Sequence, residues 1–150
     1  MEQRNKLQSE RLDFLLDALK EDSIQYKNLQ VGNSETEKRN AVRSLMNVRM
    51  PRSISDDFLE VQDIFLQEEA KEKGIVTCND IPVIEQEYPC SEIKNSDRIS
   101  LWRGDITRLG VDAIVNAANS QLLGCFVPCH AASTTPIHSA AGIQLRNECA

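Results

Sequence analysis

The sequence has few aromatic residues and no excess of basic ones. Aromatic residues make up 5% of the 150 positions, and 17 Lys and Arg face 23 Asp and Glu, for a formal net charge of −6. A nucleic-acid binder needs a basic face to neutralise phosphates, so we expect no nucleic-acid partner. The remaining composition, 41% hydrophobic and 27% charged, is that of a globular chain with a core.

Long apolar runs are also lacking. The N-terminal segment MEQRNKLQSERLDFLLDALKED is charged throughout, unlike a signal peptide, and no later stretch approaches the length that spans a bilayer. We therefore predict a cytoplasmic protein with no membrane partner. The five cysteines are odd in number and unevenly spaced, which favours free thiols or a metal site over a disulfide framework.

Apolar spacing predicts a helical first half. Leucines recur at helical intervals within residues 5–21, which predicts one amphipathic helix. Residues 34–37 have the spacing of a capping box, and the apolar stripe that follows should end at Pro51. Ser55, followed by two aspartates, starts a third predicted helix that runs toward Gly74. These stripes are typical of core packing.

The pattern changes after Gly74. Residues 74–97 read as a connector with a short turn of helix around residues 79–81. The segments RISLWR at 98–103 and VDAIV at 111–115 then predict two strands, with Leu109-Gly110 as the turn between them.

A helix is predicted again at the end of the chain, where residues 137–149 place apolar side chains along one face. Two strands and a helix, following a helical segment, indicate the start of an α/β layer rather than an all-α domain. Only about 55 residues follow position 95, which is few for an independent core.

Gly104-Asp105-Ile106-Thr107 comes just after the first predicted strand. Ligands of open α/β sheets bind in the crevice beyond the carboxyl ends of the strands. Gly104 would let a ligand approach the backbone closely, and Asp105 would accept a hydrogen bond from an exocyclic amine. A simple turn is the alternative interpretation of this segment.

Asn116-Ala117-Ala118-Asn119 follows the second predicted strand. Each asparagine offers a hydrogen-bond donor and an acceptor, which suits ribose hydroxyls or an oriented water. An Asx-type turn that closes the strand is the alternative.

Taken in order, LWRGDITRLGVDAIVNAANSQLLG, CFVPCH and IHSAAG resemble the opening of a zinc-dependent macrodomain. The upstream LMNVRMPRSISDDFLEVQDIFLQEE is similar to the helical extension that accompanies this branch, so the resemblance covers most of the chain from about Val42 onward. It implies an α/β fold class: a helical N-terminal extension over residues 1–95, followed over residues 96–150 by an incomplete macrodomain, a mixed sheet flanked by helices. It also implies a truncated module.

The resemblance implies a hydrolase that binds ADP-ribose and removes it from modified proteins. Asp105 and Ile106 would face the adenine, and Asn116 and Asn119 would face the distal ribose. Asn119 would be the catalytic residue that helps to orient the substrate. The expected partners are ADP-ribose or an ADP-ribosylated protein. Backbone amides of glycine-rich loops would hold the pyrophosphate, which agrees with the acidic composition.

The same resemblance implies zinc as a cofactor, bound in the family by Cys, His and a second Cys. Cys125 and His130 match the first two ligands, but Ala132 stands at the position of the second Cys, and Thr134 stands where family hydrolases often carry Asp. Catalytic zinc usually has three protein ligands, so weak metal binding and impaired hydrolysis are predicted. The alternatives are a non-catalytic ADP-ribose-binding module and a helical protein-interaction fragment.

Overall fold

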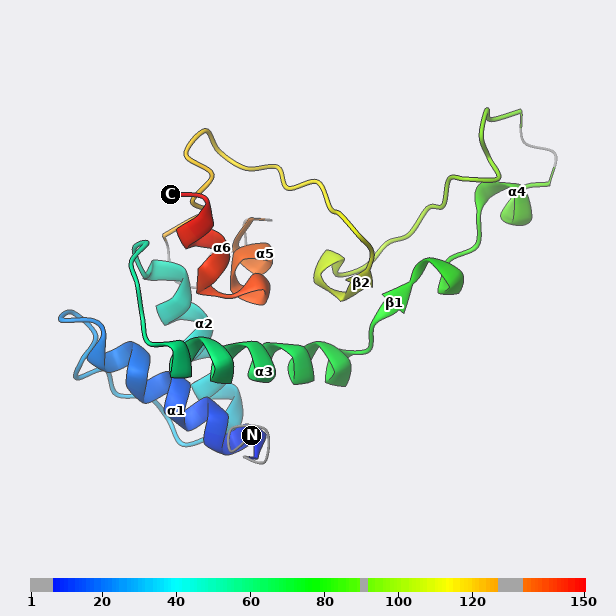
Figure 1. The fold of residues 1–150 in the computed structure, drawn as a ribbon. Helices are drawn as coiled ribbons and strands as arrows, with labels where there is room; N and C mark the ends of the chain where they lie inside the picture. The colour runs from blue at the N-terminus through cyan, green and yellow to red at the C-terminus, as the bar shows by residue number, and fades with distance from the viewer. Residues whose placement is uncertain (1–6, 90–91, 127–133) are drawn as a thin grey trace. The chain divides into compact units, whose positions relative to one another are not determined.

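In a computed structural model of the chain, residues 7–89, 92–126 and 134–150 are described (Figure 1). They form two compact units, one of Met1–Glu69 with Asn116–Ala150 and one of Ala70–Val115. The expected boundary at residue 95 stays a prediction. Within the described ranges, no helix combines the length and the apolar character that crossing a membrane requires.

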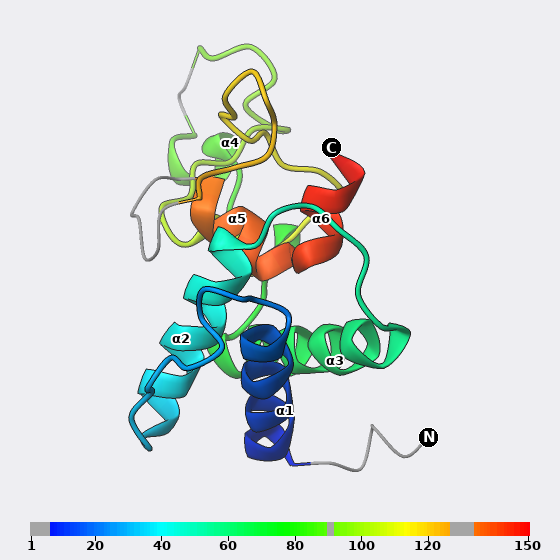
Figure 2. The ribbon, with the colours of Figure 1, turned by 90° about the vertical axis from the view of Figure 1, so that its left-hand side faces the viewer.

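The N-terminal part of the first unit contains three helices: α1 (Gln8–Glu21), α2 (Glu35–Val48) and α3 (Asp56–Lys73), of which the last turn belongs to the second unit. Figure 2 shows α1 beside α2, with α3 crossing them. All three helices were predicted. The capping box of α2 is also confirmed, because Ser34 Oγ accepts a hydrogen bond from Glu37 N at 3.3 Å and Ser34 N donates one to Glu37 Oε2 at 3.3 Å.

The core of this unit lies where the apolar stripes of the three helices meet. Phe58 and Val61 of α3 are 0% exposed, as is Leu15 of α1. Burying a side chain of this size stabilises the fold by about 1.5–3 kcal/mol relative to exposing it. The buried hydrophobic residues are Leu12, Leu15, Leu16, Leu19, Val42, Leu45, Met46, Phe58, Val61, Phe65, Leu66 and Ile143.

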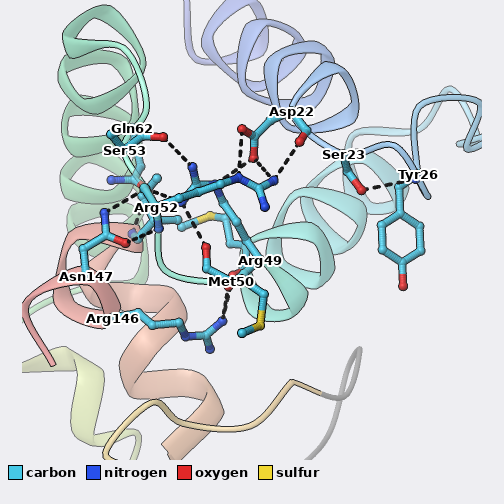
Figure 3. Close-up of polar contacts among 12 residues, drawn as sticks. Asp22, Ser23, Tyr26, Arg49, Met50, Arg52, Ser53, Gln62, Arg146 and Asn147 are labelled. Atoms are coloured by element: carbon cyan, nitrogen blue, oxygen red, sulfur yellow. Dashed lines mark hydrogen bonds and ion pairs between the residues drawn. The ribbon is translucent and has the colours of Figure 1, made fainter. Parts of the chain in front are cut away.

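An ion-pair cluster fixes the ends of α1 and α2 (Figure 3). Asp22, the C-cap of α1, accepts hydrogen bonds from Arg49 Nε at 2.8 Å and from Arg52 Nη2 at 2.6 Å. Partial burial alone would raise the pKa of Asp22, but the hydrogen bonds from Arg52 and Arg49 outweigh it and hold that pKa below its usual value. The carboxylate is therefore ionised at neutral pH and ties the segment after α2 to the end of α1.

The predicted helix over residues 137–149 is wrong in one respect, because the structure has two helices there, α5 (Thr134–Ala141) and α6 (Ile143–Glu148). The break is at Gly142, whose φ of 88° is incompatible with a continuous right-handed helix. The buried side chain of Gln62 fills the break, since its Oε1 accepts a hydrogen bond from Ile143 N at 3.0 Å. A contact with α3 therefore decides where α6 begins.

The second unit contains short elements. Strands β1 (Val76–Thr77) and β2 (Leu109–Gly110) pair in parallel, with Val76 opposite Leu109. Helix α4 spans Ile84–Glu87. The predicted turn around residues 79–81 is confirmed as the 3₁₀ helix η2 (Cys78–Asp80).

The predicted strands at 98–103 and 111–115 are wrong in position. Both segments are described, and neither forms a strand; Ser100 makes only an isolated antiparallel bridge with Val83. Leu109-Gly110, predicted as a turn, is β2. The apolar run is exposed, with Val115 at 90%, so no neighbouring strand buries it as the pattern requires. The α/β class is confirmed as helices with a small parallel sheet, and the macrodomain identity stays a prediction.

Candidate functional site

Asp105 starts a 3₁₀ turn in the unit of residues 70–115. Its Oδ1 accepts hydrogen bonds from Thr107 N at 3.0 Å and Thr107 Oγ1 at 2.7 Å, and so caps η3 (Ile106–Arg108), which leads directly into β2. The hydrogen bond from the Thr107 side chain holds the pKa of Asp105 below its usual value, assisted by the charges of Lys73 and Arg108. The carboxylate is ionised and exposed, and its Oδ2 has no hydrogen-bond partner among the described residues.

Gly104 lies against the ring of Trp102. A Cβ at position 104 would lie 2.3 Å from Trp102 Cζ2, so only glycine leaves room for the indole in this position. The ring therefore lies beside the backbone of Gly104. Ile106, the residue after Asp105, is half-buried. This arrangement offers an aromatic face, an anionic acceptor and an accessible backbone within five residues.

We expect Gly104→Ala to displace the indole. Trp102 is the only tryptophan of the chain, so its emission should shift to the red and its quenching by acrylamide should increase. Stability should change by no more than about 0.5 kcal/mol, because the position lies at the surface. The matched control is Gly110→Ala, whose added Cβ would meet Ile75 at 3.1 Å and not the indole. Identical emission from both variants and the parent would contradict the expectation.

In the other unit, Asn119 closes its own loop. Asn119 Oδ1 accepts a hydrogen bond from Gln121 N at 3.2 Å, and its Nδ2 donates to Gly124 O at 3.3 Å. This is the Asx-type turn that was the alternative interpretation of the segment. Asn116 differs, because its Oδ1 is buried and has no hydrogen-bond partner among the described residues. Of the two amide oxygens, that of Asn116 is the one without a hydrogen bond among the described residues.

His138 of α5 packs under this loop. Gly124 has a φ of 73°, and a Cβ there would lie 2.8 Å from His138 Cδ2, so the imidazole rests directly on the loop backbone. The side chain is 5% exposed, and its Nδ1 has no hydrogen-bond partner in the described parts of the chain. Burial, together with the charge of Arg146, lowers the pKa of His138.

This shift predicts a pH dependence of stability. A histidine kept neutral in the folded state binds its proton more readily when unfolded, so the free energy of unfolding should fall as pH drops below the ordinary pKa of 6.5. We expect His138→Gln to flatten the dependence between about pH 5 and pH 7, measured by urea unfolding. Asp22→Asn should leave that slope in place, since the pKa of Asp22 lies below its usual 3.8. An unchanged slope in His138→Gln would refute the assignment.

Arg146, a buried residue of α6, contacts the same loop and was not predicted from the sequence. Its Nη2 donates to Cys125 O at 3.5 Å, and its guanidinium carbon lies 4.5 Å from the centre of the Phe126 ring. The only sequence signal for Arg146 was that a charged residue stands on a helix face whose other residues are apolar. Its partners, however, lie about 20 and 100 positions away in the sequence.

The predicted metal ligands are only partly described. Cys125 is half-buried, whereas His130 and Ala132 lie outside the described residues. Within residues 7–89, 92–126 and 134–150, no three His, Cys, Asp or Glu side chains gather closely enough to hold a metal ion. The described residues do not by themselves make a zinc site. Asp105 and Ile106 belong to one compact unit, and Asn116 and Asn119 belong to the other.

The sequence matches no family profile. It is 45% identical over 143 residues to a protein from Treponema medium named Protein-ADP-ribose hydrolase, covering 95% of this chain and 52% of that protein. It is 34% identical over 140 residues to a Staphylococcus aureus protein of the same name, covering 93% of this chain and 48% of the relative. Over 95% of its own length, the chain is therefore similar to a protein-ADP-ribose hydrolase, and it spans about half the length of the curated relatives it matches.

Proposed function

We propose that this chain binds ADP-ribose and takes part in removing it from modified proteins. The similarity to proteins named protein-ADP-ribose hydrolase, extending over 95% of the chain at 45% identity, carries this proposal. The similarity includes both segments with candidate site residues, the turn at Asp105 and the loop at Asn116 and Asn119. The function is that of the macrodomain resemblance, and the substrate is an ADP-ribosylated protein.

The geometry of the turn at Asp105 suits an adenine ring. The unshared Oδ2 of an ionised carboxylate would accept a hydrogen bond from the exocyclic amine, and hydrogen bonds to charged acceptors are the stronger kind. The indole of Trp102, which lies beside Gly104, would provide an aromatic face on which a base could stack. The pyrophosphate would be held by backbone N–H groups, because the net charge of −6 leaves no general excess of cations.

The loop at Asn116 would receive the distal ribose. The buried Oδ1 of Asn116 would accept a hydrogen bond from a ribose hydroxyl, which would satisfy an atom that has no partner among the described residues. Asn119 would act on the substrate by fixing the loop and by presenting the remaining capacity of its amide. This assigns Asn119 to orienting the substrate, as the resemblance implies.

Zinc remains part of the proposal as a weakly held ion. Cys125 and His130 would be its ligands, and Ala132 supplies no donor in place of a third. We expect less than one zinc per chain after dialysis against a mild chelator, measured by atomic absorption. Full retention of one zinc would overturn the expectation of a weakened site.

Release of ADP-ribose from a modified protein tests the function directly. The full chain is incubated with a mono-ADP-ribosylated protein, and free ADP-ribose is measured by chromatography, with Asn119→Ala in parallel. Calorimetry with ADP-ribose measures binding in the same preparation. We expect slow release by the parent, in keeping with the predicted impairment, and slower release still by Asn119→Ala. The proposal would be rejected if the parent released no ADP-ribose and also gave no saturable heat at millimolar ADP-ribose.

A non-catalytic ADP-ribose-binding module is the second candidate. The observation that favours it is the Asn119 amide, whose donor and acceptor both make hydrogen bonds inside the loop. Thr134 also stands where family hydrolases often carry a carboxylate, and a hydroxyl cannot act as a base at neutral pH. Saturable heat without release of ADP-ribose would decide for this candidate.

A further inference from the structure

Arg146 of α6 is a buried cation. The residue is 4% exposed, and in the part of the chain that the structure describes no Asp or Glu forms an ion pair with it. Taking a charge out of water without a partner is costly, so other groups must compensate for the guanidinium.

The carboxyl end of α2 supplies that compensation. Arg146 Nη1 donates to the carbonyl oxygens of Met46 at 3.3 Å, Asn47 at 2.6 Å and Arg49 at 2.9 Å, and Figure 3 shows the side chain extended toward this backbone. The last carbonyls of a helix have no partner within the helix and carry the negative end of its dipole. Arg146 therefore caps α2 from α6, almost 100 residues away in sequence.

The same guanidinium reaches the loop on its other side. Nη2 donates to Cys125 O at 3.5 Å, and the guanidinium carbon lies 4.5 Å from the centre of the Phe126 ring. An arginine over an aromatic face within about 6 Å gains from a cation–π interaction. One side chain thus joins the end of α2 to the loop that Asn119 closes, and the planar guanidinium allows both sets of contacts at once.

We infer that Arg146 is a positioning residue, which holds the backbone of Cys125 and Phe126 against the end of α2 and so fixes the loop over residues 119–126. Its importance for ADP-ribose rests on the proposed function, because that function assigns the loop to the distal ribose. The role of Arg146 in fixing the loop is independent of that proposed function. Lysine cannot replace the guanidinium, because a single ammonium cannot cap the helix and lie on the ring together.

Alkylation of Cys125 measures the position of the loop without reference to activity. The full chain is treated with iodoacetamide, and peptide mass spectrometry gives the rate at each cysteine, with the exposed Cys78 as internal reference. We expect Arg146→Met to raise the rate at Cys125 about tenfold relative to Cys78, because loss of a charged hydrogen bond and a ring contact lets the loop open locally.

The matched control is Arg49→Met. Arg49 is also a buried arginine, 6% exposed, which donates to backbone carbonyls after the end of α2. Its side chain pairs with Asp22 and, among the described residues, donates no hydrogen bond to the loop over residues 119–126. Arg49→Met should lower stability and leave the relative rate at Cys125 unchanged. Equal rises in both variants would assign Arg146 to general stability and overturn the inference, as would no rise in Arg146→Met.

Arg146→Lys decides the matter if Arg146→Met does not fold. It keeps the cation and should raise the relative rate at Cys125 several-fold, because the ring contact and part of the cap are lost. A rate equal to that of the parent would overturn the inference. Calorimetry with ADP-ribose on the same proteins separates the two proposals. A parent without ADP-ribose binding removes the proposed function, whereas the alkylation rates still decide the role of Arg146.

Discussion

Gly142→Ala should destabilise the protein by about 3 kcal/mol or more. The φ of 88° at this position costs a non-glycine residue about 1–2 kcal/mol. The added Cβ would also lie 2.5 Å from Gln62 Nε2, and Gln62 is 0% exposed, so it cannot move aside into solvent. Moving it breaks the hydrogen bond from Ile143 N to Gln62 Oε1, and a buried group left unsatisfied costs a further 1–3 kcal/mol or so.

Gly74→Ala separates backbone strain from the clash. Gly74 has a φ of 80°, but a Cβ there would meet only Arg108 Nη2, at 3.3 Å and at the end of a flexible side chain. We expect this variant to lose about 1–2 kcal/mol, as strain alone predicts. Urea unfolding followed by circular dichroism measures both variants. Equal losses would show that Gln62 does not decide where α6 begins.

Helices with local signals were predictable from the sequence. The capping box at Ser34 and Glu37 and the cap at Ser55 act within four residues, and the apolar stripes they precede need no knowledge of the partner surface. The break at Gly142 has no such local signal. The break there is set by Gln62, which lies 80 positions earlier. A glycine within an apolar helix pattern does not by itself predict a positive φ.

The strands were not predictable in the same way. A β-branched run such as residues 111–115 shows that the side chains suit a sheet, but a strand exists only where another strand accepts its hydrogen bonds. β2 forms at Leu109-Gly110 because β1 lies beside it, and β1 was assigned to a connector in the sequence. Pairing of two-residue segments more than 30 positions apart leaves almost no periodic signal.

The residues of the candidate site also differ in whether local or long-range contacts position them. The turn at Asp105 and the loop at Asn119 are built from contacts over two to five residues, so their composition was informative. Sequence reasoning found these residues and left open whether their side chains bind a ligand or close a turn. His138 and Arg146 act from helices that pack on the loop, and only the fold brings them there.

The second large effect is expected at Asp105. If the proposed function holds, Asp105→Ala should weaken ADP-ribose binding by about 10- to 100-fold, because the variant loses the charged acceptor that we propose for the adenine amine. The variant also loses the carboxylate oxygen that accepts hydrogen bonds from Thr107 N and Thr107 Oγ1 and caps η3, so the turn before β2 would loosen. Asp105→Asn keeps a capping oxygen without the charge. An intermediate affinity for Asp105→Asn in calorimetry would separate the acceptor from the cap.

Asp80 provides the matched control for this measurement. It is a carboxylate of the same unit, it also caps a 3₁₀ turn, and its Oδ2 accepts from Thr77 N at 2.8 Å and Thr77 Oγ1 at 2.7 Å. The side-chain hydrogen bond from Thr77 lowers the pKa of Asp80, as that from Thr107 lowers the pKa of Asp105, so both carboxylates are ionised. Asp80→Ala should therefore remove a comparable set of capping hydrogen bonds and leave the affinity for ADP-ribose unchanged. Equal weakening in both alanine variants would mean that binding depends on the unit's stability, and no weakening in either would remove Asp105 from the site.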